Sequence, residues 1–239
     1  MKLKKKEKKN YKHLSLIIVL VALLLLLLIV AIFILKPRTN VIEKFSYNNL
    51  NFLVEDFGKT NEGKRVLFYH TEVFFPKYNL TYRLYLRYDP RENKVPVDLE
   101  ELKVIKSPTY ISIDKNFDGK NCSEVLVASY KLGEFLTALQ VKGEIAVWYP
   151  NWAEPTYNSY LVIPDYAWAN QHNVTVIVLK YNETNESSSR VYNNNDTVII
   201  ESNNCNILEA EEKFTLFVIE KLIKLGSFKP KKFEEIENK

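Results

Sequence analysis

The arrangement of hydrophobic and polar residues changes character several times along the chain. Residues 14–35 form an apolar run of 22 residues in which Ser15 is the only polar residue. An α-helix of that length would extend about 33 Å, which matches the ~30 Å hydrocarbon core of a bilayer. The run also lacks the polar face of a buried amphipathic helix. It therefore predicts one transmembrane helix over residues 14–35.

A cleaved signal peptide is the alternative interpretation of this run. The apolar part of a signal peptide is usually about 7–15 residues long and precedes small residues at the cleavage site. Here the run is longer and ends in Lys36-Pro37-Arg38, without a pattern of small residues. Both observations favour an uncleaved signal anchor, so the lipid bilayer is the first partner that the sequence predicts.

Lysines dominate the segment before the apolar run. Seven of the first thirteen residues are Lys, and only Glu7 opposes them. Because a basic flank stays on the cytoplasmic side, we expect residues 1–13 to form a cytoplasmic arm, residues 36–44 a linker and residues 45–226 an extracellular domain. The expected location is the plasma membrane, crossed once, with the N-terminus cytoplasmic and the C-terminal domain extracellular.

Alternation of apolar and polar residues, which is typical of strands, marks the first part of this domain. Residues 80–88 alternate strictly, with Leu84 and Leu86 on one face and Arg83 and Arg87 on the other. Further predicted strands are residues 45–52, 65–75, 102–105, 110–114, 174–181 and 197–201.

Two segments instead repeat apolar residues at the three- and four-residue spacing of amphipathic helices. One covers residues 125–139 and the other residues 207–225; the second is preceded by Asn206, a favoured N-cap residue, and followed by Gly226. Charged residues then dominate, so we expect a disordered tail over residues 227–239. The predicted fold class is an α+β ectodomain, with a β-rich first half and two helices with intervening strands, behind one N-terminal transmembrane helix.

The position of the charges changes the meaning of the net charge. The whole chain carries +4 at pH 7, a value that invites a nucleic-acid function. Without the eight lysines and one glutamate of residues 1–36, the chain has 25 cationic and 28 anionic residues. The predicted domain is therefore slightly acidic, and no nucleic-acid partner is expected. The six glycines stand apart from one another, which excludes a glycine-rich phosphate loop, and no cofactor is expected.

Cysteine and asparagine patterns agree with an oxidising, extracellular environment. Cys122 and Cys205 each precede a predicted helix, so one disulfide that joins the starts of both helices is the simplest expectation. Two buried free thiols are the alternative. We expect glycosylation at several of the Asn-x-Ser/Thr acceptor triplets, which occur at Asn79, Asn121, Asn173, Asn182, Asn185 and Asn195.

An aromatic segment, residues 148–168, is the leading candidate for a binding region. It contains all three tryptophans and four tyrosines, interleaved with prolines that interrupt regular structure. Exposed rings on a stiff loop can stack on sugars or anchor a protein interface; the alternative is that these rings fill the core. The predicted partner is an envelope protein or a glycan, and the candidate contact residues are Trp148, Tyr149, Trp152, Tyr157, Tyr160, Tyr166 and Trp168.

Patterns typical of catalysis and metal binding are sparse. Beyond the apolar run only His70 and His172 could join a catalytic triad, and neither lies in a nucleophile motif. A calcium loop that begins at Asp114 would need an acidic ligand at its twelfth position, where the chain has Val125; an Asx turn is the alternative there. We therefore predict no metal site and name no catalytic residue, although paired carboxylates elsewhere would permit an enzyme.

Three short motifs stand out in the predicted domain. They are Phe45-x-Tyr47-Asn48, the run Leu-Arg-Tyr-Asp-Pro-Arg-Glu at 86–92, and the run Asn-Cys-Asn-Ile-Leu-Glu-Ala-Glu-Glu-Lys-Phe at 204–214. Together they resemble uncharacterised single-pass, membrane-anchored archaeal envelope proteins. The resemblance implies an archaeal cell envelope and carries no known activity.

The function expected from the sequence is a membrane-anchored extracellular binding or scaffolding module of the cell envelope, glycosylated and disulfide-linked. Two alternatives stay open: an accessory subunit of a membrane protein complex, and an extracellular hydrolase.

Overall fold

The structure is a computed structural model that describes residues 18–26, 41–99, 109–114, 116–117, 122–139, 143–145, 175–182, 189–194, 197–203 and 205–237. The chain divides into two compact units, residues 1–40 and residues 41–239. Every described strand lies in the second unit.

The first unit corrects the predicted fold class. Helical backbone is described there over residues 18–26. Among the described residues, no helix is both long and apolar enough to cross a membrane. The predicted fold class, with its transmembrane helix over residues 14–35, is therefore wrong. The bilayer partner and the plasma-membrane location were deduced from that helix and are untested.

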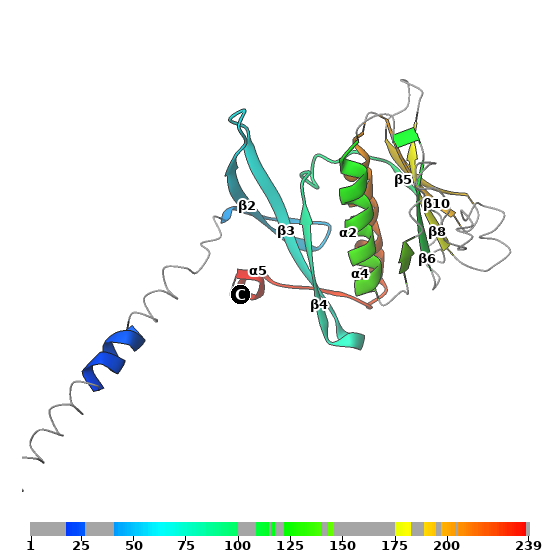
Figure 1. The fold of residues 1–239 in the computed structure, drawn as a ribbon. Helices are drawn as coiled ribbons and strands as arrows, with labels where there is room; N and C mark the ends of the chain where they lie inside the picture. Colours follow the sequence, from blue (N-terminus) through cyan, green and yellow to red (C-terminus); the bar gives the residue numbers. More distant parts are fainter. Residues whose placement is uncertain are drawn as a thin grey trace, which may run out of the picture. The chain divides into compact units, whose positions relative to one another are not determined.

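The second unit is a mixed α/β fold in which two helices lie between two β-sheets (Figure 1). The helices are α2 (Glu124–Ala138) and α4 (Ile207–Lys224). An antiparallel sheet contains β1 (Val41–Tyr47), β2 (Leu50–Lys59), β3 (Arg65–Phe75), β4 (Leu80–Leu86) and β11 (Lys229–Pro230). A mixed sheet contains β5 (Val97–Asp98), β6 (Thr109–Ile113), β7 (Gly143–Ile145), β8 (Thr175–Tyr181), β9 (Arg190–Asn194) and β10 (Thr197–Ser202).

Tight turns connect neighbouring strands of the antiparallel sheet. The single strand predicted over residues 45–52 is two strands, because Asn48 and Asn49 adopt positive φ angles of 48° and 64° and form the β1–β2 hairpin. Hairpin turns whose central residues have positive φ angles often contain asparagine. The short 3-10 helix η1 (Pro76–Tyr78) and Asn79 join β3 to β4. Among the described strands, β4 pairs only with β3, so it is an edge strand.

The mixed sheet follows the order β5-β9-β10-β8-β6-β7. Strands β10, β8, β6 and β7 are parallel neighbours, whereas β9 is antiparallel to β10. Parallel strands need a crossover connection, and α2 lies in the connection between β6 and β7. All six residues of β10 are buried, as expected for a central strand that is covered on both faces.

Both helices contribute to one hydrophobic core that extends into both sheets. Phe52 and Phe75 enter it from the antiparallel sheet, Phe135 and Phe214 from the helices, and Ile177 from the mixed sheet. The predicted disulfide is confirmed: Cys122 and Cys205, with Cα atoms 5.1 Å apart, join the starts of α2 and α4. The disulfide therefore fixes the two helices side by side at one end.

The C-terminal segment corrects the predicted disordered tail. Strand β11 pairs with β3, and the short helix α5 (Phe233–Glu237) follows it. Phe228 is buried against Phe75, with ring centroids 3.8 Å apart, and Ile236 is only 4% exposed. Residues 227–237 are therefore packed onto the antiparallel sheet. These two apolar anchors are isolated among charged residues, so they gave no periodic signal in the sequence.

Candidate functional site

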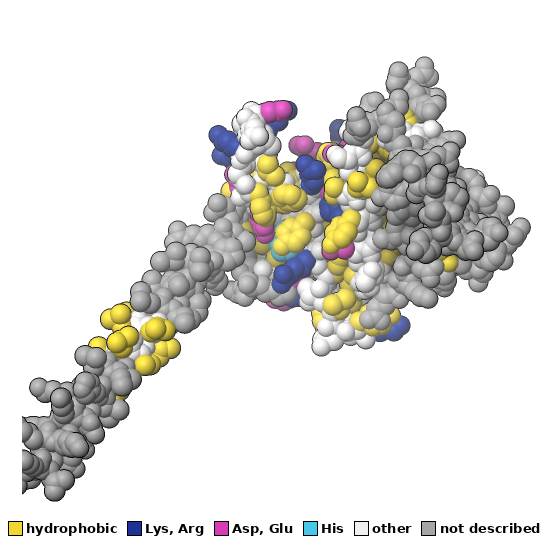
Figure 2. Space-filling view, viewed as in Figure 1, with side chains coloured by type: hydrophobic (Ala, Val, Ile, Leu, Met, Phe, Trp, Pro, Cys, Tyr) yellow, Lys and Arg dark blue, Asp and Glu magenta, His cyan; other side chains and the backbone are white. Residues whose placement is uncertain are grey.

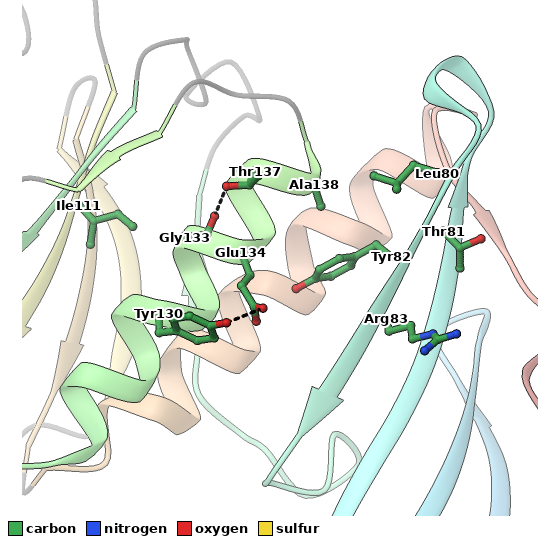
Figure 3. A pocket seen from close by; sticks show the side chains of 10 residues that line it. All are labelled: Leu80, Thr81, Tyr82, Arg83, Ile111, Tyr130, Gly133, Glu134, Thr137 and Ala138. Carbon is green, nitrogen blue, oxygen red and sulfur yellow. Dashed lines mark hydrogen bonds between the residues drawn. The ribbon is translucent and has the colours of Figure 1, made fainter. Parts of the chain in front are cut away.

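A groove of about 750 Å³ lies between the edge strand β4 and one face of α2 (Figure 3). Its volume is within the range of about 300–1,000 Å³ that is typical of ligand sites. Four consecutive strand residues form one side, five helix residues form the other, and one residue of β6 also lines it: Leu80, Thr81, Tyr82, Arg83, Tyr130, Gly133, Glu134, Thr137, Ala138 and Ile111.

Alternation along β4 decides which side chains enter the groove. Tyr82 points toward the helices, whereas Arg83 points to the opposite side of the strand (Figure 3). The Tyr82 ring contacts Phe135 of α2, with centroids 5.7 Å apart. The Arg83 guanidinium instead donates a hydrogen bond to Glu72 of β3 at 2.9 Å. The strand therefore offers apolar and aromatic side chains to the groove and keeps its cation behind the sheet.

Within the described part of the chain, the outer edge of β4 has no partner strand. The strand pairs with β3 from Leu80 opposite Phe75 to Leu86 opposite Tyr69. In an antiparallel pair only every second residue bonds to its partner strand, and the others point their N–H and C=O groups outward. No other described strand pairs with those outward groups. Unpaired strand edges are templates for a further strand.

Helical spacing builds the opposite wall. Tyr130, Gly133, Glu134, Thr137 and Ala138 recur at intervals of three and four residues and so share one face of α2. Gly133 contributes no side chain to this wall. A glycine inside a helix costs roughly 1 kcal/mol relative to alanine.

One carboxylate dominates the charge of the groove. Of the lining residues only Arg83 and Glu134 are charged, and Arg83 is turned away. Glu134 is exposed and accepts a hydrogen bond from the Tyr130 hydroxyl at 3.0 Å. This hydrogen bond raises the pKa of Tyr130, so its hydroxyl stays neutral. The described lining therefore presents a negative charge beside two tyrosines.

Two consecutive glutamates of α4 are buried behind the groove. Glu212 accepts hydrogen bonds from the Lys131 ammonium at 2.6 Å and from the backbone N–H groups of Arg87 and Tyr88 at 2.8 and 3.1 Å. Burial raises the pKa of Glu212, and these donors oppose that effect. Glu212 therefore joins the end of β4 to both helices.

Glu211 has a different environment. Its Oε1 accepts a hydrogen bond from the Thr215 hydroxyl at 2.7 Å, while its buried Oε2 has no partner among the described residues. Burial raises the pKa of Glu211 to about 8, so the group is a neutral acid at neutral pH. Burial, followed by the influence of Glu211 and Glu134, also raises the pKa of Tyr82. Glu211 therefore interacts electrostatically with Tyr82, which lines the groove.

A second polar cluster occupies the other face of the antiparallel sheet. His70 Nδ1 lies 3.2 Å from Glu55 Oε1, and His70 Nε2 lies 3.8 Å from Glu72 Oε1. The imidazole stacks on Tyr85 with ring centroids 4.3 Å apart. Figure 2 shows a histidine almost covered by hydrophobic and basic side chains. Burial lowers the pKa of His70.

The cations around this cluster indicate a structural role. Glu72 accepts Arg83 on Oε1 and Lys231 on Oε2, the latter at 3.2 Å. The cluster therefore ties β3, β4 and the C-terminal segment together. Within the part of the chain that the structure describes, no group of three His, Cys, Asp or Glu residues could hold a metal ion.

Of the site residues predicted from the sequence, the structure describes some and leaves others outside the described residues. The seven aromatic candidates between Trp148 and Trp168, and His172, lie outside the described residues. Asp114 accepts hydrogen bonds from the backbone N–H groups of Asn116 and Tyr181, as in an Asx turn. The candidate contact residues stay predictions, and the Asp114–Asn116 hydrogen bond is that of the Asx turn expected as the alternative to a calcium loop.

Two of the six acceptor asparagines are described. Asn79 is exposed in the turn after η1, with a φ of 51°, directly before the groove residues Leu80 and Thr81. Asn182 is half-buried, and its backbone N–H donates to Ser202. The other four, which lie outside the described residues, are Asn121, Asn173, Asn185 and Asn195.

The groove itself was missed at the level of sequence. Its open edge depends on the pairing of β4 with β3, which local patterns do not reveal. Two signals were nevertheless present in α2. Tyr130 lies off the apolar stripe of the helix and is 64% exposed, and Gly133 interrupts the helix interior.

Comparison with known proteins finds no matching family model, no matching curated protein and no matching solved structure. The resemblance to archaeal envelope proteins, and the function expected from the sequence, therefore stay predictions.

Proposed function

We propose that this protein is a binding module that captures a partner in the groove between β4 and α2, in an oxidising compartment outside the cytoplasm. The observation that carries the proposal is the groove itself. An open strand edge and the apolar side chains of Leu80 and Tyr82 face a helix wall that bears Tyr130 and Glu134.

The chemistry of the lining supports binding. Ligand sites combine mostly apolar surface with a few polar groups that fix orientation. Here the tyrosine hydroxyls of Tyr82 and Tyr130, the Thr137 hydroxyl and the Glu134 carboxylate are those polar groups. Tyrosines also contribute large contact areas at low conformational cost, which is why they are enriched in binding interfaces.

The compartment is supported by the disulfide. Disulfides persist in oxidising environments and are rare where thiols are kept reduced. Cys122 and Cys205 are the only cysteines of the chain, and they are bonded to each other. The exposed acceptor Asn79 is also accessible to a glycosylation enzyme.

Selection of ligands tests the proposal. Random heptapeptides displayed on phage are panned on the full chain and on a Gly133→Leu variant. Leucine is a better helix former than glycine, so the variant should fold while its side chain fills the groove. Enriched peptides should bind the wild type and lose at least about tenfold in affinity on Gly133→Leu, which corresponds to about 1.4 kcal/mol.

Leu126→Ala is the matched control. Leu126 lies on the same helix and is 55% exposed, but it does not line the groove. Its truncation should leave peptide binding unchanged. If no peptide is enriched, or if Gly133→Leu binds as well as the wild type, the groove is not the binding site. Circular dichroism of both variants establishes that each is folded.

A further inference from the structure

We infer that the occupant of the groove is an extended polypeptide segment with basic side chains, which adds to β4 as a new strand of the antiparallel sheet. The inference rests on the proposed function and names the chemistry of the partner. Three features carry it: the unpaired backbone of β4, the shape of the α2 wall, and the charge of Glu134.

The backbone of β4 provides the first feature. Seven residues from Leu80 to Leu86 form the strand, which is about 23 Å at ~3.3 Å per residue. About three of them direct both N–H and C=O away from β3. An extended peptide satisfies such groups through its own main chain, which gives affinity, while its alternate side chains give specificity.

Both edges of the sheet carry exposed apolar and charged side chains. At the β1 edge, Glu43 is exposed and forms an ion pair with Arg91 at 2.6 Å. Charged side chains at an edge discourage pairing with another chain. The β1 edge also carries Ile42, at 48% exposure, and the β4 edge carries Leu80 and Tyr85, at 39% and 36% exposure, together with the exposed Arg83. The groove between β4 and α2 is therefore the feature that favours the β4 edge for strand addition.

The helix wall gives the second feature. A new strand lies about 4.8 Å from β4, and its side chains alternate between the two faces of the sheet. Side chains on the helix-facing side would meet the wall formed by Tyr130, Gly133 and Thr137. The missing side chain at Gly133 leaves room there. The Tyr130 ring, 64% exposed, offers a flat surface beside that space.

Charge gives the third feature and decides the kind of segment. The Glu134 carboxylate is the charge that the described lining presents to an occupant, because Arg83 pairs with Glu72 behind the sheet. A lysine or arginine on the helix-facing side of the added strand is complementary to it. Pairs of this kind contribute more to specificity and association rate than to affinity.

Chemical variants of one peptide test strand addition. The most strongly enriched phage heptapeptide is synthesised in three forms: the parent, and two forms that are N-methylated on alternate amides in the two possible phases. N-methylation removes a hydrogen-bond donor. Only one phase of a strand faces its neighbour, so one methylated form should bind at least about tenfold more weakly while the other binds like the parent. Equal affinities of all three forms would overturn strand addition.

The charge is tested with Glu134→Gln and with a peptide in which norleucine replaces each basic residue. Both changes should weaken binding by about twofold to fivefold at low salt, and together they should weaken it no more than either alone. An unchanged affinity, or peptides enriched without basic residues, would overturn the basic partner.

Two further outcomes separate this inference from the proposed function. If no peptide binds at all, the proposed function fails together with the inference. If the wild-type chain forms a dimer in sedimentation, and Gly133→Leu abolishes that dimer, the occupant is a second copy of the chain and the inference is overturned while the groove remains an interface.

Discussion

Replacing Glu211 with Gln should make the protein more stable at neutral pH and less sensitive to pH. Glu211 is fully buried, accepts one hydrogen bond from Thr215 and leaves Oε2 without a described partner. Glutamine has nearly the same shape, and its carbonyl oxygen can accept the same hydrogen bond. It carries no ionisable proton, so the substitution isolates the effect of the charge.

The sign and size of the effect follow from linkage between proton binding and folding. The folded pKa of Glu211 is about 8, above the ordinary value of 4.5, so the folded state binds the proton more tightly than the unfolded state. The stabilisation is complete below pH 4.5 and is lost as pH rises through 8. Each pH unit in this window removes about 1.4 kcal/mol. By pH 7 the loss is about 3 kcal/mol, which the Gln variant avoids.

Urea unfolding of both proteins at several pH values between 4.5 and 8, followed by circular dichroism, measures the difference. Glu134→Gln is the control, because it makes the same chemical change at an exposed position of α2. Its stability should follow that of the wild type at each pH. The free energies of unfolding of the Glu211→Gln variant and the wild type should diverge as pH rises. If their difference is instead the same at every pH in this range, Glu211 is ionised in the folded state and the reasoning about its burial is refuted.

Three further predictions follow from other parts of the fold. Reduction of the Cys122–Cys205 disulfide, which closes a separation of 83 residues, should lower the free energy of unfolding by up to ~4.5 kcal/mol; equal urea midpoints for both forms would contradict this. In a glycosylating host, mass spectrometry should find a glycan on Asn79, and Asn79→Gln should strengthen peptide binding to the adjacent groove; an unmodified Asn79 would refute the first part. Phe228→Ala should cost about 3–5 kcal/mol, because the ring is buried against Phe75; a loss below about 1 kcal/mol would mean that the C-terminal segment does not pack there.

Local patterns predicted most regular elements of the domain. The predicted strand over residues 65–75 coincides with β3, and both predicted helices lie within a residue of α2 and α4. Periodicity is informative here because each element buries one face or one stripe in the shared core. The disulfide was also predictable, since two cysteines before two helices leave one pairing.

Features that depend on distant residues were not predictable in the same way. The edge position of β4 and the closeness of α2 to it arise from tertiary contacts, so the groove has no local pattern. Phe228 and Ile236 are single anchors in a charged segment and therefore looked like a solvated tail. For residues 14–35 the hydropathy predicted more than the structure describes. It predicted a membrane-spanning helix, and the described residues contain none.

Residue-resolved amide hydrogen exchange of the full chain, with and without the enriched heptapeptide, tests the central claim most directly. Strand addition in the groove should slow exchange at alternate amides of β4 between Leu80 and Leu86, and leave the β1 edge unchanged. Exchange along β4 that is identical with and without bound peptide would contradict the account.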